Sequence, residues 1–471
     1  MKFYNRKKEL NTINEWVNLS KKSTQVGVIF GRRRIGKTRL IKEALSKKNY
    51  LYFFIERKPI TELLSDFKEA IAELADLPSG IQFQDLTAFL QLIVQIAEKK
   101  QLILVFDEFQ NFRYIDPKVF GIFQQWIDEI KDNKGLTIIF IGSMFGLMKK
   151  IFTEYKEPLY GRLTGQINLK PLSPIIEKEI LADLGIYTPE NLLKFHIIFG
   201  GIPRYYDLLS DRINMIHTPM DAIKQLIVSP YSILKEEGKA VLMEEFGKKF
   251  MVYFSILQAI SSGYHTRNQI SGASGLNYNQ LSPYLSSLEK HYELIERRTP
   301  IFSNKAQSKT SAFYIRDNFL IFWFRYLHKY SRLVEIEAYD RLNDIISKDF
   351  TILEGTGFES LTMKLLIALN GNSNWEFSFD DIGRYWDRMN REIDIVFINH
   401  TEKYIFFGEC KVNGNRVNKN MWKTLTQKSS HILQKYRKYQ AIYGAFVVKN
   451  VENAFTKGCV YSLNDLLQHI H

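Results

Sequence analysis

The segment Gly31-Arg32-Arg33-Arg34-Ile35-Gly36-Lys37-Thr38 decides the fold of this chain. It fits the pattern Gly-x-x-x-x-Gly-Lys-Ser/Thr, follows the apolar run Val26-Gly27-Val28-Ile29-Phe30, and opens a helix-forming run that continues through Arg39. In a strand, glycine loop and helix of this kind, backbone N–H groups and the helix N-terminus hold phosphate groups. The segment therefore predicts nucleotide binding, with Lys37 reaching the β- and γ-phosphates and the Thr38 hydroxyl ligating Mg²⁺.

A second stretch supports the first. The apolar run Gln101-Leu102-Ile103-Leu104-Val105-Phe106 ends in Asp107-Glu108, which is typical of a buried parallel strand with acids at its carboxyl end. Ligands of open α/β sheets bind at this edge. We expect Asp107 to hold Mg²⁺ through water and Glu108 to polarise the attacking water. An acidic strand end by itself is often only a turn. Together with the glycine loop, however, it indicates hydrolysis of a nucleoside triphosphate.

Length, charge and cysteine content limit the possible domain number, partners and cellular compartment of the protein. A chain of 471 residues predicts roughly three domains, and a net charge of +13 favours an acidic partner such as nucleic acid, an indifferent basic surface being the alternative. Two cysteines, Cys410 and Cys459, give neither a disulfide framework nor a zinc motif by themselves. The first residues lack the apolar core of a signal peptide, and no run approaches the ~20 apolar residues of a membrane span. We therefore expect a reduced, cytoplasmic protein without membrane contact.

The order of predicted elements divides the chain. Residues 1–170 alternate strands and helices, which predicts an α/β fold with a parallel sheet covered on both faces. Residues 171–235 are predicted to be helical, with a break at Gly200-Gly201-Ile202-Pro203-Arg204-Tyr205-Tyr206. Residues 315–345 carry an aromatic stripe that is more typical of a core than of a ligand site, and residues 350–471 return to mixed α/β.

Residues 236–314 suggest helix-turn-helix order with an appended β-ribbon. Short helices are expected near residues 254–260, 266–270 and 278–291, followed by strands at 293–298 and 311–315 with a polar, basic connection, Thr299 to Thr310. The helix near 278–291 can reach base edges or phosphates through Asn277, Tyr278, Asn279, Gln280, Ser282 and Tyr284. Because it carries few cations, docking of a protein is the alternative.

Three acids and a lysine form a second candidate site. Glu359 lies on an expected helix, Asp394 lies on an alternating strand, and Glu409 and Lys411 lie on the next strand. Residues i and i+2 of a strand share a face, so Glu409 and Lys411 point the same way and Asp394 can join them. Oxygen ligands of this kind suit one or two Mg²⁺ or Mn²⁺ ions, and Lys411 can act on water or on developing phosphate charge. The alternative is a surface ion pair between strands.

These motifs together resemble the archaeal-type ATPases, a branch of the STAND/AAA+ group of P-loop NTPases, many of which carry a C-terminal PD-(D/E)xK nuclease-like domain. The resemblance covers nearly the whole chain. It implies an ATPase core (residues 1–170), a helical lid (171–235), a winged helix (236–314) and a restriction-endonuclease-like α/β domain (315–471). It also implies ATP rather than GTP, since no guanine-reading Asn-Lys-x-Asp motif stands in the expected place.

The resemblance also assigns residues. Phe3-Tyr4-Asn5-Arg6-Lys7-Lys8-Glu9-Leu10 is similar to the opening motif beside the nucleotide base, and Ser143 stands at the sensor position. Pro158-Leu159-Tyr160-Gly161-Arg162 resembles the Tyr-Gly-Arg motif, which implies that Arg162 approaches the γ-phosphate of its own or a neighbouring chain. Pro203 and Arg204 belong to a segment that is similar to the Gly-Gly-x-Pro lid motif.

One departure bears on the last domain. Ile393 stands before Asp394, where the superfamily is named for a proline. Two functions follow as hypotheses: a DNA-associated ATPase coupled to a nuclease-like domain, or a STAND-type nucleotide switch that binds a protein partner and carries an inactive C-terminal domain.

Overall fold

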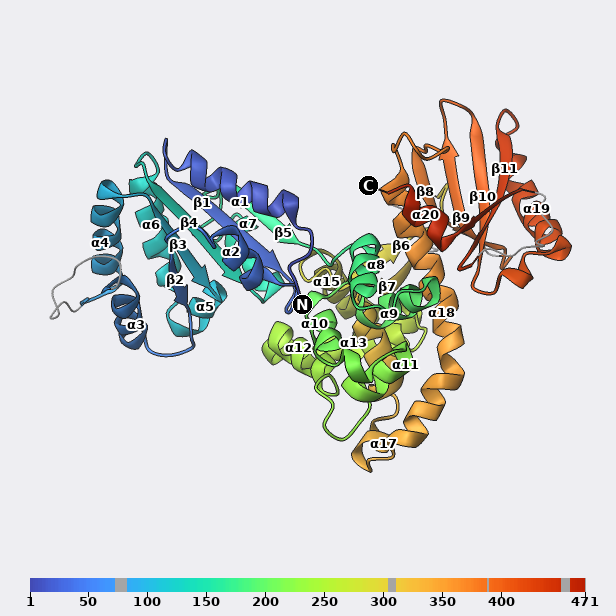
Figure 1. The fold of residues 1–471 in the computed structure, drawn as a ribbon, viewed down its shortest axis with the longest axis horizontal. Coiled ribbons are helices and arrows are strands. Elements are labelled where there is room, and N and C mark those ends of the chain that lie inside the picture. The colour runs from blue at the N-terminus through green and yellow to red at the C-terminus, as the bar shows by residue number, and fades with distance from the viewer. Residues whose placement is uncertain (73–82, 304–310, 388, 450–457, 471) are drawn as a thin grey trace. The chain divides into compact units, whose positions relative to one another are not determined.

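The computed structural model describes residues 1–72, 83–303, 311–387, 389–449 and 458–470. The chain forms two compact units (Figure 1). The N-terminal unit comprises residues 2–171, and the C-terminal unit comprises residues 172–471 together with Met1. Among the described residues, no helix combines the length and the apolar composition that a membrane span requires.

The N-terminal unit is built on a five-stranded parallel sheet in the order β2-β3-β4-β1-β5 (Figure 1). Every residue of β1, β3 and β4 is buried, as expected of strands covered on both faces. Four strands confirm the sequence prediction, whereas β5 lies in a stretch without the apolar run that marks the others. The strands are β1 (Gln25–Gly31), β2 (Leu51–Phe54), β3 (Leu102–Asp107), β4 (Leu136–Gly142) and β5 (Gly165–Leu169).

Helices cover both faces of this sheet, as predicted. On one face, Trp16 packs against Gly27 and Gly165, where a Cβ atom would overlap the indole ring. The other face is covered by the helices that follow β2, β3 and β4. The helical elements are α1 (Lys7–Leu19), α2 (Lys37–Ala44), α3 (Ile60–Ala72), α4 (Leu86–Lys99), η1 (Phe109–Asn111), α5 (Phe112–Ile115), α6 (Val119–Ile130) and α7 (Phe145–Thr153).

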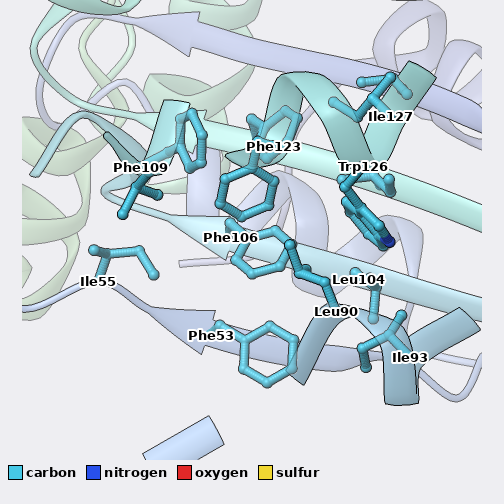
Figure 2. Packing of buried hydrophobic residues seen from close by; sticks show 14 of the residues in the cluster. Phe53, Ile55, Leu90, Ile93, Leu104, Phe106, Phe109, Phe123, Trp126 and Ile127 are labelled. Carbon is cyan, nitrogen blue, oxygen red and sulfur yellow. The ribbon is translucent and has the colours of Figure 1, made fainter. Parts of the chain in front are cut away.

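The core beneath α4 and α6 is rich in aromatic side chains (Figure 2). The Phe106 ring of β3 lies 5.1 Å from the Phe53 ring of β2 and 5.3 Å from the Phe123 ring of α6, measured between centroids. Such pairs contribute about 0.5–1.5 kcal/mol each beyond their buried area. Because Phe106 precedes Asp107, this packing holds the carboxyl end of β3, where the predicted acids lie.

The C-terminal unit begins with helices, as predicted for this part of the chain. The predicted break falls between α9 and α10, where Gly200 and Gly201 adopt left-handed φ values of 58° and 75°. The elements are α8 (Pro174–Asp183), α9 (Pro189–Phe199), α10 (Pro203–Asp211), η2 (Ile213–Met215), α11 (Pro219–Ala222), the π-helical turn η3 (Ile223–Ile227), α12 (Glu237–Phe246) and η4 (Gly247–Lys249).

Three helices and a hairpin follow in the predicted order. They are α13 (Phe250–Ser261), α14 (Arg267–Ser274), α15 (Tyr278–Lys290) and the antiparallel strands β6 (Ile295–Arg298) and β7 (Ala312–Ile315). A reciprocal capping box between Thr266 and Gln269 begins α14. Residues 304–310 of the predicted basic connection lie outside the described residues.

The aromatic stripe is a core, as predicted. The helical elements here are α16 (Asn318–Trp323), the π-helical turn η5 (Phe324–His328), α17 (Ser331–Glu335) and the long α18 (Tyr339–Leu369). The stripe residues Phe319, Phe322, Trp323, Phe324 and Tyr326 are all at most 5% exposed.

A second five-stranded sheet ends the chain, in the order β12-β11-β10-β9-β8 (Figure 1). β8, β9 and β10 pair antiparallel, while β10, β11 and β12 pair parallel, and α19 makes the crossover from β10 to β11. α19 packs on one face through Trp422 and Leu425. The elements are β8 (Asp381–Trp386), β9 (Glu392–Asn399), β10 (Tyr404–Lys411), η6 (Gly414–Arg416), α19 (Lys419–Leu433), β11 (Gln440–Val447), β12 (Cys459–Ser462) and α20 (Leu463–Gln468).

Candidate functional site

The glycine loop joins β1 to α2 in the predicted geometry. Gly36 precedes α2 with φ 91°, and Arg34 also adopts a left-handed φ of 65°. Lys37, the first residue of α2, is buried, and its Nζ donates hydrogen bonds to the carbonyl oxygens of Gly31 at 2.9 Å and Arg32 at 3.0 Å. The loop thus wraps around its lysine and presents the N-terminus of α2, as phosphate binding requires.

Asp107 lies beside this loop at the end of β3. Thr38 Oγ1 donates a 2.9 Å hydrogen bond to Asp107 Oδ2, so the two predicted Mg²⁺ ligands are in contact. Mg²⁺ usually binds through one or two carboxylates with water and phosphate oxygens completing its shell, and this pair fits that preference.

Tyr52 also reaches Asp107, although nothing in the local sequence marks it. Its hydroxyl donates to Asp107 Oδ2. Burial raises the pKa of Tyr52, and the Asp107 charge raises it further, so the phenol stays a donor. Tyr52 lies on β2, which pairs with β3, and only the strand order brings it to the site.

Glu108 and the predicted sensor Ser143 also meet. Ser143 Oγ donates a 2.8 Å hydrogen bond to Glu108 Oε2, and Gln110 Nε2 donates to the same oxygen. Glu108 adopts a left-handed φ of 56°, which turns the chain sharply at the end of β3. Gln110 and Met148 pack so closely on Gly142 that a Cβ there would overlap both side chains. Gln110 is a further site residue that the sequence does not mark.

The opening motif is anchored at the same edge of the sheet. Arg6 is buried, and its Nη2 donates a 2.7 Å hydrogen bond to the carbonyl oxygen of Lys170. Burial lowers the pKa of Arg6, although Glu9 opposes this. Lys170 follows β5 at its carboxyl end, where Leu169 pairs with Gly31. Asn5, which is exposed, precedes Arg6, so the motif lies on the side of the sheet that carries the phosphate loop.

Arg162 lies where the parallel strands begin, whereas the phosphate loop lies where they end. It precedes β5, whose first residues pair with the start of β1, and Thr164 N donates to Val26 O at 2.9 Å. The distance along β1 from Val26 to Gly31 is roughly 16 Å at about 3.3 Å per residue. The Arg162 guanidinium instead makes two hydrogen bonds to Asp128, of 3.0 and 2.8 Å. This corrects the expectation that Arg162 approaches the γ-phosphate of its own chain; action on a neighbouring chain stays a prediction.

The predicted lid residues belong to the C-terminal unit. Pro203 begins α10 and Arg204 is exposed on its first turn. The motif's Tyr206 is fully buried, and its hydroxyl donates a 2.6 Å hydrogen bond to Glu177 of α8. Tyr206 therefore ties α10 to α8, while nucleotide contact by Pro203 and Arg204 stays a prediction.

The second candidate site assembles as the strand periodicity predicts. Lys411 Nζ lies 2.6 Å from Glu409 Oε2 and 3.8 Å from Asp394 Oδ2. Asp394 Oδ2 also accepts a 2.9 Å hydrogen bond from the Cys410 backbone. Among the described residues, no three acidic, histidine or cysteine side chains form a metal-binding group. Two carboxylates still suffice for Mg²⁺ when water and a phosphate complete its shell, so Asp394 and Glu409 fit the ion.

Two more cations enter this site. Arg384 Nη2 of β8 lies 2.9 Å from Glu359 Oε2 of α18, and Lys428 Nζ of α19 lies 3.2 Å from Glu409 Oε1. Three carboxylates thus meet three cations. Arg384 falls in a segment that resembles the nuclease-like domain, but Lys428 has no sequence signal, because only the crossover of α19 places it over β10.

Burial and crowding perturb these groups. Burial raises the pKa of Glu359 to about 7, with a contribution from the Asp394 charge. Burial and the neighbouring Glu409 also raise the pKa of Asp394. Burial alone would lower the pKa of Lys411, but the charges of Glu409 and Asp394 outweigh it and raise that pKa. Groups with shifted pKa values are typical of functional sites, although structural ion-pair networks also shift pKa values.

The fold and the phosphate-loop site define a P-loop ATPase. Residues 3–207 match a family described as an ATPase domain predominantly from Archaea, and residues 323–425 match archaeal and bacterial proteins of unknown function. An uncharacterized protein of Methanocaldococcus jannaschii is 31% identical over 468 residues, covering 98% of this chain and 99% of that protein. The chain therefore belongs to the archaeal-type ATPase family.

The solved structure of a Walker-type ATPase supports the fold. A Walker-type ATPase of Pyrococcus abyssi superposes with a TM-score of 0.53 and 19% identity, over 69% of this chain and 96% of that one. The ORC2 protein of Aeropyrum pernix gives a TM-score of 0.49 and 15% identity, over 74% of this chain and 96% of that one.

Proposed function

We propose that the chain hydrolyses ATP with Mg²⁺ at the phosphate loop and that this cycle acts on a DNA-associated, nuclease-like C-terminal region. The observation that carries the ATPase assignment is the Thr38–Asp107 hydrogen bond beside the loop that wraps Lys37. It joins the two Mg²⁺-binding side chains at the edge where the helix N-terminus receives phosphate.

Each residue then has a chemical task. Lys37 and the N–H groups of the loop hold the β- and γ-phosphates, and Glu108 orients the attacking water. Bound Mg²⁺ would neutralise charge that develops on the phosphates. Ser143 and Gln110, which hydrogen-bond Glu108, set the direction of its carboxylate. Arg162 would complete the site of a neighbouring chain if the protein assembles.

Lys37→Ala tests the assignment. Removing this charge should weaken nucleotide binding and lower ATP turnover by about 10²–10³-fold, the usual effect of losing one donor to a developing charge. Lys42→Ala is the matched control, because Lys42 is exposed on the same helix. ATP turnover by Lys37→Ala at the wild-type rate would show that another site hydrolyses the nucleotide.

DNA association is supported by an exposed polar helix end. Asn277, Asn279 and Gln280 are exposed at the start of α15, in the position of a recognition helix. In the hairpin, however, Arg298 pairs with Glu296 and its guanidinium lies 4.3 Å from the Tyr314 ring, so this arginine has intramolecular partners. We therefore assign DNA contact to the exposed polar start of α15.

The nuclease-like assignment rests on the order α18, β8, β9, β10, α19, β11 and on the cluster of Glu359, Asp394, Glu409 and Lys411. Lys411 would act on water or on the scissile phosphate. The second candidate function, a nucleotide switch that binds a protein partner through an inactive C-terminal domain, is favoured by one observation: each carboxylate of this cluster already has a cation nearby.

A cleavage assay separates the two functions. Wild type and Lys411→Ala would be tested on supercoiled, linear and single-stranded DNA, with Mg²⁺ or Mn²⁺ and with or without ATP. Cutting by wild type alone establishes the nuclease, and ATP dependence establishes coupling. ATP turnover without cutting favours the switch.

A further inference from the structure

Arg384 lies at an irregularity in the C-terminal sheet. The pairing of β8 with β9 changes register between Gly383 and Tyr385, so Arg384 occupies a β-bulge. Its carbonyl oxygen accepts a 2.8 Å hydrogen bond from the backbone of Ile301, in the connection that follows β6. Ile301 is buried in the core of this sheet. Bulges re-aim side chains and are common beside active sites, and here the neighbouring segment holds the bulge in place.

The bulge directs the guanidinium to the acidic cluster. Arg384 Nη2 lies 2.9 Å from Glu359 Oε2, yet this buried oxygen receives no well-directed hydrogen bond from any residue that the structure describes. The contact is therefore an ion pair of loose geometry. About a quarter of the Arg384 side chain is exposed. A guanidinium carries five N–H donors, so most of its hydrogen-bonding capacity is not used by Glu359.

Lys428 approaches the cluster from α19. Its Nζ lies 3.2 Å from Glu409 Oε1, while Lys411 contacts the other oxygen of that carboxylate. The Lys428 side chain is 27% exposed, so solvent reaches it. Arg384 contacts Glu359 and Lys428 contacts Glu409, so the two cations lie beside different acids of the cluster.

We propose that Arg384 and Lys428 are phosphate-binding residues of this site, which hold the phosphodiester backbone of a DNA strand when Asp394 and Glu409 bind a divalent cation. The inference rests on the proposed nuclease-like function and adds its substrate contacts. A carboxylate that turns to a divalent cation no longer neutralises its lysine, so Lys428 becomes available to a phosphate. The planar guanidinium of Arg384 matches two phosphate oxygens at once.

This arrangement makes cation and DNA binding support each other. If the cation increases DNA affinity by a given factor, DNA must increase cation affinity by the same factor. The effect is a property of the site itself and does not require cleavage.

Fluorescence anisotropy with labelled single-stranded and duplex DNA tests the proposal on the full chain, with Ca²⁺ or with EDTA. Wild type should bind more tightly with Ca²⁺. Arg384→Ala and Lys428→Ala should each weaken this binding about tenfold, as expected for a hydrogen bond to a charged group. Each should also lower the slope of log affinity against log salt by about 0.7–0.9.

Arg332→Ala and Lys423→Ala are the controls, since Arg332 is exposed on α17 and Lys423 is exposed on α19. Calorimetric Ca²⁺ binding without DNA should be retained in both test variants and lost in Asp394→Asn. Arg384→Lys keeps the charge and should keep the salt slope while losing affinity, which tests the site even if Arg384→Ala fails to fold.

Two results would overturn the proposal, and they have different consequences for the proposed nuclease-like function and for DNA association. If wild type binds DNA with Ca²⁺ but Arg384→Ala and Lys428→Ala match it in affinity and salt slope, these residues are structural ion-pair partners and the nuclease-like function stands. If wild type binds no DNA with or without Ca²⁺, DNA association and the phosphate contacts are both excluded.

Discussion

The two candidate sites satisfy their carboxylates in different ways. At the ATPase site, hydroxyl and amide groups donate hydrogen bonds to Asp107 and Glu108. At the C-terminal site, Glu359, Asp394 and Glu409 face ammonium and guanidinium groups. The donors at the ATPase site bring no positive charge to the acids, whereas the groups that face the acids of the C-terminal site are cations.

This difference predicts different responses to metal ions. A divalent cation at Thr38 and Asp107 displaces a neutral hydrogen bond. At Asp394 and Glu409 it competes with Lys411 and Lys428 for the same oxygens. Under the proposed function, a metal ion would enter the ATPase site without displacing a cation, whereas at the C-terminal site it would have to replace the lysines that now contact Asp394 and Glu409.

The largest effect expected at the ATPase site is that of Glu108→Gln. Loss of the group that orients water should lower the rate of ATP hydrolysis by about 10²–10⁴-fold. Binding of Mg²⁺–ATP should remain near wild type, because the substitution keeps the shape and the Thr38–Asp107 pair. Steady-state turnover and equilibrium binding of labelled ATP measure the two effects, with Glu43→Gln, exposed on α2, as control. Unchanged turnover would remove the assigned role of Glu108.

The pH dependence of the free energy of unfolding tests the protonation of Glu359 at the C-terminal site. Glu359 retains its proton up to about pH 7 in the folded chain, whereas its ordinary pKa is 4.5. The folded state thus holds more protons between these values, and the free energy of unfolding falls as pH rises through this window. The decrease should reach about 1–3 kcal/mol, given 1.36 kcal/mol per pKa unit and partial exposure.

Glu359→Gln should remove this decrease, because glutamine does not titrate. Unfolding free energies of wild type and variant between pH 5 and pH 8 measure the difference, and Glu335→Gln, exposed on α17, is the control. Parallel pH profiles for wild type and Glu359→Gln would show that Glu359 is ionised throughout this range and forms an ordinary ion pair with Arg384.

The smallest effect is expected for Tyr52→Phe. Removing the phenol hydroxyl deletes one hydrogen bond to Asp107 and should weaken Mg²⁺–ATP binding by about 1 kcal/mol, or about fivefold. The Mg²⁺ concentration for half-maximal turnover should rise while the maximal rate changes little. Tyr155→Phe, 84% exposed, is the control. A reduced maximal rate at saturating Mg²⁺ would instead give Tyr52 a part in the chemical step.

Local sequence predicts elements best where one periodicity dominates. Apolar residues dominate the runs at β1, β3 and β4, and these runs become parallel strands that are buried along their whole length. β5 carries Gly-Gln-Ile-Asn-Leu, which is too mixed to signal a strand, and it forms because β1 offers an open edge. Sequence reasoning left open whether Arg162 acts on its own or on a neighbouring chain, because its position just before β5 depends on that unpredicted strand.

The sequence by itself determined the chemistry that resides in contiguous residues: the phosphate loop, the acids that end β3, and the alternation that brings Glu409 beside Lys411. Side chains of a strand alternate between its two faces, and a glycine loop takes its shape from neighbouring residues. Both features can therefore be predicted without knowledge of the fold. Tertiary structure alone decided that Tyr52 and Gln110 join the ATPase site and that Arg384 and Lys428 join the acids. Those contacts depend on strand order, a bulge and a helical crossover, which unite residues far apart in the chain.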